Sequence, residues 1–204
     1  MALTTYTEIA NKVSEWLNRE GHNSISTNVE DFIIVSQRRI MRDIRTPTME
    51  TSSVLSITDG QATIPSDMLD VKEMIAENGT SAWDVRRSTF GDVKTKRLKN
   101  TSGPVVFDTV AGNFEFGPEP SSGVTVTLIY YKEINFITSS VATNWFSLYA
   151  GELILYGALS EAAIFLKDTA MADVYDEKFR QALADLKEQR RKAEYSGLLQ
   201  VNNR

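Results

Sequence analysis

Apolar residues at helical spacing open the chain and predict a first helix. Thr5 and Glu8 have the spacing of a capping box, which places the helix start at Thr5. The apolar positions that follow recur three or four residues apart: Tyr6, Ile9, Val13, Trp16 and Leu17. The turn-forming segment from Gly21 to Ser24 ends this helix near Gly21.

A second capping box, Thr27 with Glu30, predicts the start of a second helix, and Pro47 forces its end. The apolar positions expected to face the core are Val29, Phe32, Ile33, Ile40 and Ile44. Most of the outward positions near its end are basic, which suits the negative end of the helix dipole.

From residue 48 to about residue 132 the apolar period changes from helical to alternating. Asp59-Gly60 predicts a hairpin between residues 55–57 and 62–64, and Ala111-Gly112-Asn113 predicts a second one. Residues 124–131 alternate but are apolar on both faces, so we expect a strand that is covered on both sides, by the helices or by another subunit.

Two further helices are expected after this middle segment. Asn144 is the candidate cap of the third helix, which is apolar around nearly its whole circumference and is therefore expected to be central. Its apolar positions include Leu148, Tyr149, Leu153, Leu155, Leu159 and Phe165. Asp168-Thr169 breaks the chain and starts a fourth, longer helix that packs back on the third as an antiparallel hairpin.

The predicted fold class is α+β and mainly α: a four-helix body, with two N-terminal and two C-terminal helices, interrupted by a β-rich insertion between the second and third helices. The expected boundaries are residues 1–47 and 140–197 for the body, 48–139 for the insertion and 198–204 for an extended tail. The tail carries Leu198, Leu199 and Val201 with nothing local to cover them, which suggests a partner.

Composition narrows the function classes. The 204 residues suit one elaborated domain, and 42% hydrophobic residues are enough for a real core. The net charge of −5 disfavours a general nucleic-acid binder, and the absence of Cys excludes disulfides, thiolate metal sites and thiol nucleophiles. No secretory signal is expected at residues 1–8, and the apolar span 145–166, which contains Glu152 and Glu161, is expected to be a buried helix with no membrane partner.

The sequence offers little catalytic chemistry. His22 is the only histidine and lies in a turn, away from any recognisable triad, and no phosphate loop or metal motif is present. The remaining enzymatic route is a carboxylate pair such as Glu152 and Glu161, but nine residues on a helix place them about 180° apart. We therefore expect no catalytic residue, no metal and no cofactor.

One stretch is strongly basic. Its cations are Arg86, Arg87, Lys94, Lys96, Arg97 and Lys99, against the single acid Asp92. These six residues are a candidate patch facing an acidic partner or DNA, and the alternative is an ordinary solvated surface.

The order of these pieces resembles the head-to-tail adaptor, or connector, proteins of short-tailed bacteriophages, which include the tail tubular protein A-like proteins. The resemblance spans roughly residues 5–197 and is carried by short motifs in a fixed order. These are Arg38-Arg39-Ile40-Met41-Arg42-Asp43-Ile44-Arg45, Ile64-Pro65-Ser66-Asp67-Met68-Leu69, Phe116-Gly117-Pro118-Glu119-Pro120, Thr143-Asn144-Trp145 and Leu155-Tyr156-Gly157-Ala158-Leu159. Ala150-Gly151 departs from the Pro-Asp of that family.

The resemblance implies a structural virion protein without enzymatic activity. It implies a homo-oligomeric ring of about a dozen copies in the neck or tail of the virion, assembled in the cytoplasm of the bacterial host. The partners would be the portal protein and the tail tube or nozzle protein, with DNA passing through the lumen without specific contacts. Two alternatives remain: a small cell-wall-degrading glycoside hydrolase or nucleic-acid-processing enzyme, and a ring-forming interaction module of another purpose.

Overall fold

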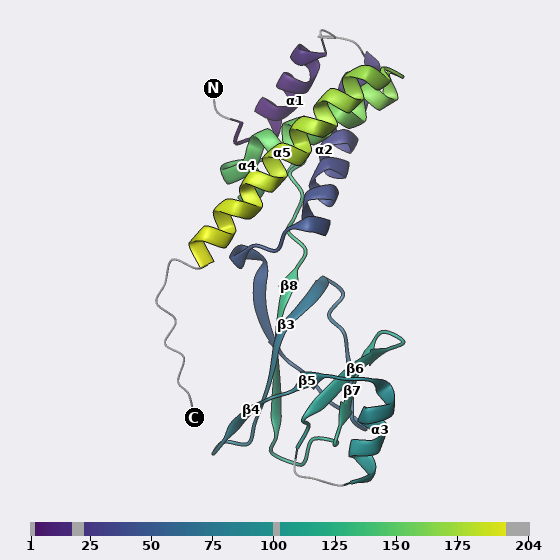
Figure 1. Ribbon diagram of the computed structural model, residues 1–204, viewed down its shortest axis with the longest axis vertical. Helices are drawn as coiled ribbons and strands as arrows, with labels where there is room; N and C mark the ends of the chain where they lie inside the picture. The colour runs from purple at the N-terminus through teal and green to yellow at the C-terminus, as the bar shows by residue number, and fades with distance from the viewer. Residues whose placement is uncertain (1–2, 18–22, 100–102, 195–204) are drawn as a thin grey trace. The chain divides into compact units, whose positions relative to one another are not determined.

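The computed structural model describes residues 3–17, 23–99 and 103–194, which form an α+β fold (Figure 1). The chain divides into two compact units. The helical unit combines the chain up to Ile44 with the chain from Ile134 onward, and the β unit is the continuous segment Arg45–Glu133. The predicted α+β class is therefore confirmed.

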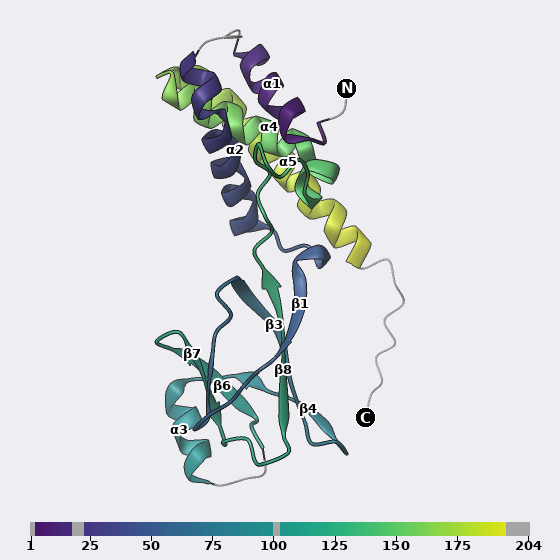
Figure 2. The ribbon, with the colours of Figure 1, turned by 180° about the vertical axis from the view of Figure 1, so that it is seen from behind.

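The described part of the helical unit contains α1 (Tyr6–Trp16), α2 (Asn23–Asp43), α4 (Trp145–Phe165) and α5 (Thr169–Glu194). α1, α2 and α5 all pack against α4, and α1 and α2, which are seen on either side of α4 (Figures 1 and 2), also contact each other. α4 is therefore the central helix that its apolar sequence predicts. By length and composition alone it is the one described helix that could cross a membrane, but most of it is buried by the other helices.

Close approach of two helices depends on Gly157. The Oγ atom of Ser36 on α2 donates a hydrogen bond of 3.0 Å to the main-chain oxygen of Ile154 on α4. A Cβ atom on Gly157 would lie 2.2 Å from the same Oγ atom, so only glycine allows this spacing. Ser36 is fully buried at this crossing.

Asn144 caps α4 as predicted and also joins the helix to α2. Its Oδ1 atom accepts a hydrogen bond from the main-chain N–H of Ser147 at 2.9 Å, and its Nδ2 atom donates one of 2.7 Å to Oε1 of Gln37. Gln37 is buried and also accepts from the N–H of Ile137 at 2.9 Å. At Ala150 the backbone leaves helical geometry, so α4 is kinked one turn after its start.

The β unit holds two four-stranded sheets. One has the order β1 (Glu50–Val54), β8 (Thr125–Lys132), β3 (Met68–Glu77), β4 (Ala82–Asp84), and all its pairs are antiparallel. The other has the order β2 (Gln61–Thr63), β7 (Asn113–Gly117), β6 (Val106–Val110), β5 (Arg86–Arg87), of which the β5–β6 pair is parallel. A short 3₁₀ helix, η1 (Pro47–Met49), precedes β1.

Aromatic and aliphatic side chains of both sheets form one core in the β unit. Phe107 and Phe114 meet edge-on at 5.7 Å, and Phe114 and Phe116 are fully buried. On β8, Val126, Leu128 and Tyr130 are buried while the intervening residues are half-buried. We expected both faces of β8 to be covered. The described residues fully bury one face and leave the other half-buried.

The helices differ from the sequence-based expectations in three places. The described residues form five helices rather than four, because α3 (Phe90–Leu98) lies in the β unit. α2 begins at Asn23, four residues before the predicted capping box, since the fully buried Ile25 extends its packed face. α1 ends at Trp16, earlier than the expected Gly21, which lies outside the described residues together with His22.

The first predicted hairpin is wrong in its pairing. Asp59 and Gly60 do form a left-handed turn, but only the single bridge Thr58↔Gln61 closes it. Of the two predicted arms, residues 55–57 lie outside the strands, with the N–H of Leu55 donating to Val126 of β8, whereas residues 61–63 form β2 and pair with β7 in the other sheet. The second predicted hairpin is confirmed, with Ala111 and Gly112 at positive φ between β6 and β7.

Candidate functional site

The basic stretch surrounds α3 of the β unit. Thr89 caps the helix by accepting a hydrogen bond from the N–H of Asp92 at 3.4 Å, and Ser88 donates to the Asp92 carboxylate at 2.8 Å. Asp92 in the first turn and Lys96 and Arg97 in the last complement the helix dipole. The sequence therefore forms a short helix within what is otherwise a β-rich segment.

α3 lies directly on β7 because Gly117 has no side chain. A Cβ atom at Gly117 would lie 2.5 Å from the main-chain oxygen of Val93, and Val93 is fully buried beneath the helix. This contact fixes which side of α3 faces the sheet and leaves Phe90, Lys94 and Leu98 on the outside, at successive turns.

Arg97 does not belong to the exposed surface. Its guanidinium donates to the Glu115 carboxylate and to the main-chain oxygens of Gly60 and Phe116, each at 2.7 Å. The Arg97 and Glu115 side chains are only 16% and 8% exposed. Arg97 thus ties α3 to β7 and to the turn at Gly60, and it is unavailable to a ligand.

Arg86 and Arg87 are exposed on β5 but share a surface groove with carboxylates. The charged residues that line it are Asp70, Lys72, Glu73, Asp84, Arg86 and Arg87. Acids and bases are equal in number there, so this groove is not a strongly positive site.

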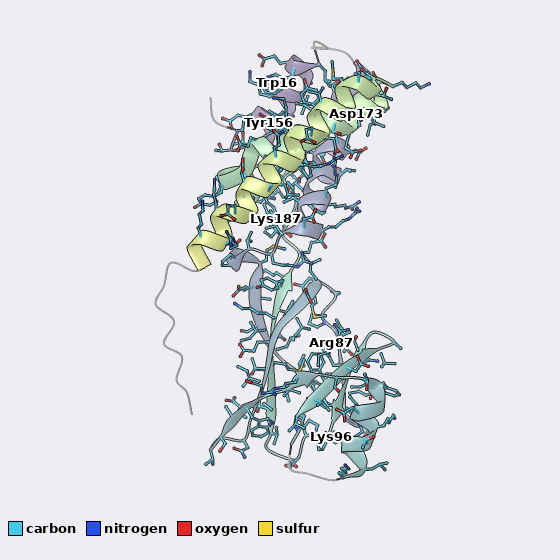
Figure 3. All side chains as sticks on the ribbon, in the orientation of Figure 1. Trp16, Arg87, Lys96, Tyr156, Asp173 and Lys187 are labelled. Carbon is cyan, nitrogen blue, oxygen red and sulfur yellow. The ribbon has the colours of Figure 1, made fainter. Side chains whose placement is uncertain are left out.

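The remaining cations of the predicted patch are lysines on α3. Lys94 and Lys99 are exposed. Lys96, which is labelled in Figure 3, is half-buried. The Lys94 ammonium lies 4.9 Å above the Phe90 ring, and Leu98 beside it is 88% exposed. Of the six predicted residues, the structure therefore brings only Lys94 together with Phe90 and Leu98 on the outer side of α3. Lys96 follows two residues later and points to the Gly117 side of the helix, where a Cβ atom on Gly117 would lie 3.1 Å from its own Cβ.

A second charged cluster, which the sequence analysis missed, joins three helices of the helical unit. Arg39 of α2 contacts Glu161 of α4 at 3.2 Å and also pairs with Asp176 of α5, while its guanidinium lies 4.3 Å from the Phe179 ring. Burial raises the pKa of Asp176, but hydrogen bonds and charge from Arg39 and Arg180 outweigh it, so the pKa lies below its ordinary value. The cluster stabilises the bundle, and nothing in the sequence spacing links its members.

The described residues hold no group of three or more His, Asp or Glu side chains placed to bind a metal ion. The predicted docking residues Leu198, Leu199 and Val201 lie outside the described residues.

Comparison with known protein families identifies the family of the chain. The model of the SU10 adaptor protein family matches residues 4–202, nearly the whole chain. The chain belongs to the SU10 adaptor protein family. It is accordingly a bacteriophage adaptor-type protein and a structural component of the virion, assembled in the host. A search of curated proteins finds no match.

Membership in the SU10 adaptor protein family agrees with a non-enzymatic chain. The positions of Glu152 and Glu161, the carboxylate pair of the enzymatic alternative, also argue against catalysis. Glu161 is bound to Arg39, whereas Glu152 is exposed nine residues earlier on α4. Nine residues correspond to about 180° around the helix axis, so the two groups cannot flank one glycosidic bond.

An adaptor acts through its surface, and the helical unit exposes apolar side chains that its sequence places in the core. Leu148 and Tyr149 on α4 are 51% and 70% exposed, although the apolar circumference of this helix predicts that both are covered. Ile164 and Phe165 at its other end are also exposed. These surfaces are candidates for contacts with other proteins of the virion.

Proposed function

We propose that the chain is a head-to-tail adaptor that forms a ring of about a dozen copies between the portal and the tail tube or nozzle of a short-tailed phage. Membership in the adaptor family over residues 4–202 is the observation that carries the proposal. The exposed apolar residues of the helical unit support it, since a ring subunit needs side chains that only another chain covers.

The tail, residues 198–204, is proposed to dock on the portal through Leu198, Leu199 and Val201. Its sequence supports this role because three apolar residues follow Gly197 within five positions. A short segment of this kind can gain order on binding in an extended conformation.

DNA is proposed to pass through the lumen of the ring without being held. The net charge of −5 supports a lumen that repels phosphate. The lysines of α3 would then face an acidic protein surface outside the lumen, with Phe90 and Leu98 adding apolar contact. A lumen lined by Lys94, Lys96 and Lys99 would contradict this arrangement.

Sedimentation of the purified protein, alone and mixed with a portal assembly, tests the proposal. We expect a ring or a saturable portal complex for the full chain, and loss of the portal complex for a chain truncated after Gly197. If both the full chain and the truncated chain remain monomeric and do not bind the portal, the adaptor proposal is overturned.

A paired substitution tests the enzymatic alternative. The parent chain and the variant with Glu152→Gln and Glu161→Gln should both lyse cell walls no more than a buffer control does. Lytic activity in the parent chain that disappears in the variant, with assembly intact, would overturn the structural assignment.

A further inference from the structure

The helical unit has an exposed aromatic surface near the start of α4. We call the aromatic face the set Trp145, Leu148, Tyr149 and Glu152. The Trp145 and Tyr149 rings lie 5.3 Å apart, and Tyr149 is 70% exposed. Glu152 is exposed and forms no ion pair with any described residue. This surface offers ring faces and one free carboxylate.

A second exposed surface lies on α2. We call the arginine face the set Val35, Arg38, Arg42 and Phe136. The Arg38 guanidinium lies 5.5 Å from the Phe136 ring, and Val35 is 37% exposed. Arg38 and Arg42 are exposed, and neither forms an ion pair within the part of the chain that the structure describes. Asp43, the acid next to Arg42, is already paired with Lys187.

The two faces lie on opposite sides of the bundle. Ser36 and Ile154 mark where α2 and α4 touch. Arg38 follows Ser36 by two residues, and Glu152 precedes Gly157, whose Cβ direction meets Ser36, by five, so the two side chains point about 160° and 140° away from the contact between the helices. Trp16 of α1 contacts Tyr156, one turn after Glu152 on α4 (Figure 3).

The two faces also lie at the same level of the bundle. α2 and α4 run antiparallel, since Phe32 meets Phe165 while Gln37 bonds to Asn144. Residues after Ser36 on α2 and residues before Ile154 on α4 therefore extend toward the same end. Arg38 and Arg42 thus lie level with Tyr149 and Glu152, on the opposite flank.

We infer that the arginine face of one copy docks on the aromatic face of the next copy in the ring. Arg38 and Arg42 stack on the exposed rings and pair with Glu152, while Val35 covers Leu148. Arginine, tyrosine and tryptophan are the residues that protein interfaces concentrate, and a guanidinium above an aromatic ring is attracted by it. The inference rests on the proposed ring and assigns its subunit contact.

Opposite faces at one level favour a second copy of this chain as the occupant. A contact between two different faces is heterologous, so a copy that is bound through one face still presents the other face to a further copy. Successive contacts of this kind form a ring when the rotation between neighbouring copies closes. Contact of the arginine face with itself would instead bring four guanidinium groups together, which disfavours a twofold dimer through this surface.

Cross-linking of introduced cysteines tests the contact, because the chain has no Cys of its own. The variants are Arg38→Cys, Tyr149→Cys and the double variant, assembled under the conditions in which the parent forms rings and then treated with a short bis-maleimide. We expect no product from either single variant, a dimer from their mixture, and a ladder of multimers from the double variant. The matched control, Arg38→Cys with Val174→Cys, uses another exposed position on α5 and should give no ladder.

Charge exchange provides a second measurement. Arg42→Glu and Glu152→Arg should each weaken self-association in sedimentation at least about tenfold, and their combination should recover most of that loss. Rings without a ladder and without recovery would overturn the face assignment but leave the adaptor proposal standing. A parent chain that remains monomeric with and without the portal would overturn both.

Discussion

Arg97 of α3 and Glu115 of β7 form an ion pair of 2.7 Å in the interior of the β unit. In the sequence, Arg97 is one of six cations in a short basic stretch and has no mark that separates it from its neighbours. In the structure, three of its hydrogen bonds connect a helix, a strand and a turn. One cation of the basic stretch, Arg97, therefore stabilises the β unit, whereas others, such as Lys94 and Lys99, are exposed on the surface.

Removal of Arg97 should destabilise the β unit strongly. Arg97→Ala leaves the Glu115 carboxylate buried without its cation, and we expect a loss of about 3–5 kcal/mol in the free energy of unfolding, measured by urea denaturation. The matched control Lys94→Ala, on the exposed side of the same helix, should change it by less than about 0.5 kcal/mol. Equal effects for the two variants would contradict the buried pair.

The crossing of α2 and α4 should not tolerate a methyl group at Gly157. Gly157→Ala forces Ser36 or the helix itself to move, and we expect a loss of about 1–3 kcal/mol in thermal or urea unfolding. Ser36→Ala alone removes one hydrogen bond, worth about 1 kcal/mol, and also removes the atom nearest to the added methyl group, although the Cβ of residue 36 stays 2.9 Å from it and the relief is partial. The double variant should therefore be more stable than the sum of the two losses predicts, and strict additivity would rule out this clash.

Asn144 combines two functions that two substitutions can separate. Asn144→Ala removes both the cap of α4 and the hydrogen bond to Gln37, so we expect a loss of about 1–2 kcal/mol or more. Asn144→Ser keeps a side-chain oxygen that can accept from Ser147 without placing a carboxylate against the oxygens of Gln37 and Asn135, and its loss should be smaller. Urea denaturation of both variants checks the order, and the reverse order would refute the capping role.

Acid should destabilise the helical unit through Asp176. The pKa of this carboxyl is lower in the folded protein than its ordinary value of 3.8. Its ion pairs therefore contribute stability that is fully present above about pH 4 and is lost as the pH falls through the folded pKa. In Asp176→Asn, the free energy of unfolding should be lower near neutral pH and should fall less steeply on acidification. An unchanged slope would show that Asp176 is not responsible.

The local signals of the sequence correctly predicted the starts of α1 and α4 and the second hairpin. The capping residues Thr5 and Asn144 lie where the helices begin, and the turn at Ala111-Gly112 joins the strands it was expected to join. Each of these signals acts between residues close in the chain, so it survives without knowledge of the fold.

The failures concern contacts between distant residues. Asp59-Gly60 predicted a hairpin, but β1 and β2 gain more from partners 50 or more residues away, on β8 and β7. α3 was missed because its one fully buried residue, Val93, gives no helical period by itself. The exposure of Tyr149 could not be read from an apolar helix, since it depends on which side α1, α2 and α5 leave open.

The insertion of the β unit also sets the order in which the protein can fold on the ribosome. Residues 45–133 are continuous and can fold as soon as they leave the ribosome, whereas α1 and α2 must wait for α4 and α5. Until then, the apolar sides of α1 and α2, with Ile9, Val13, Ile33 and Ile40, have no central helix to cover them. The helical unit can therefore be completed only after α4 and α5 have left the ribosome, and contacts between copies through its surfaces have to wait for that step.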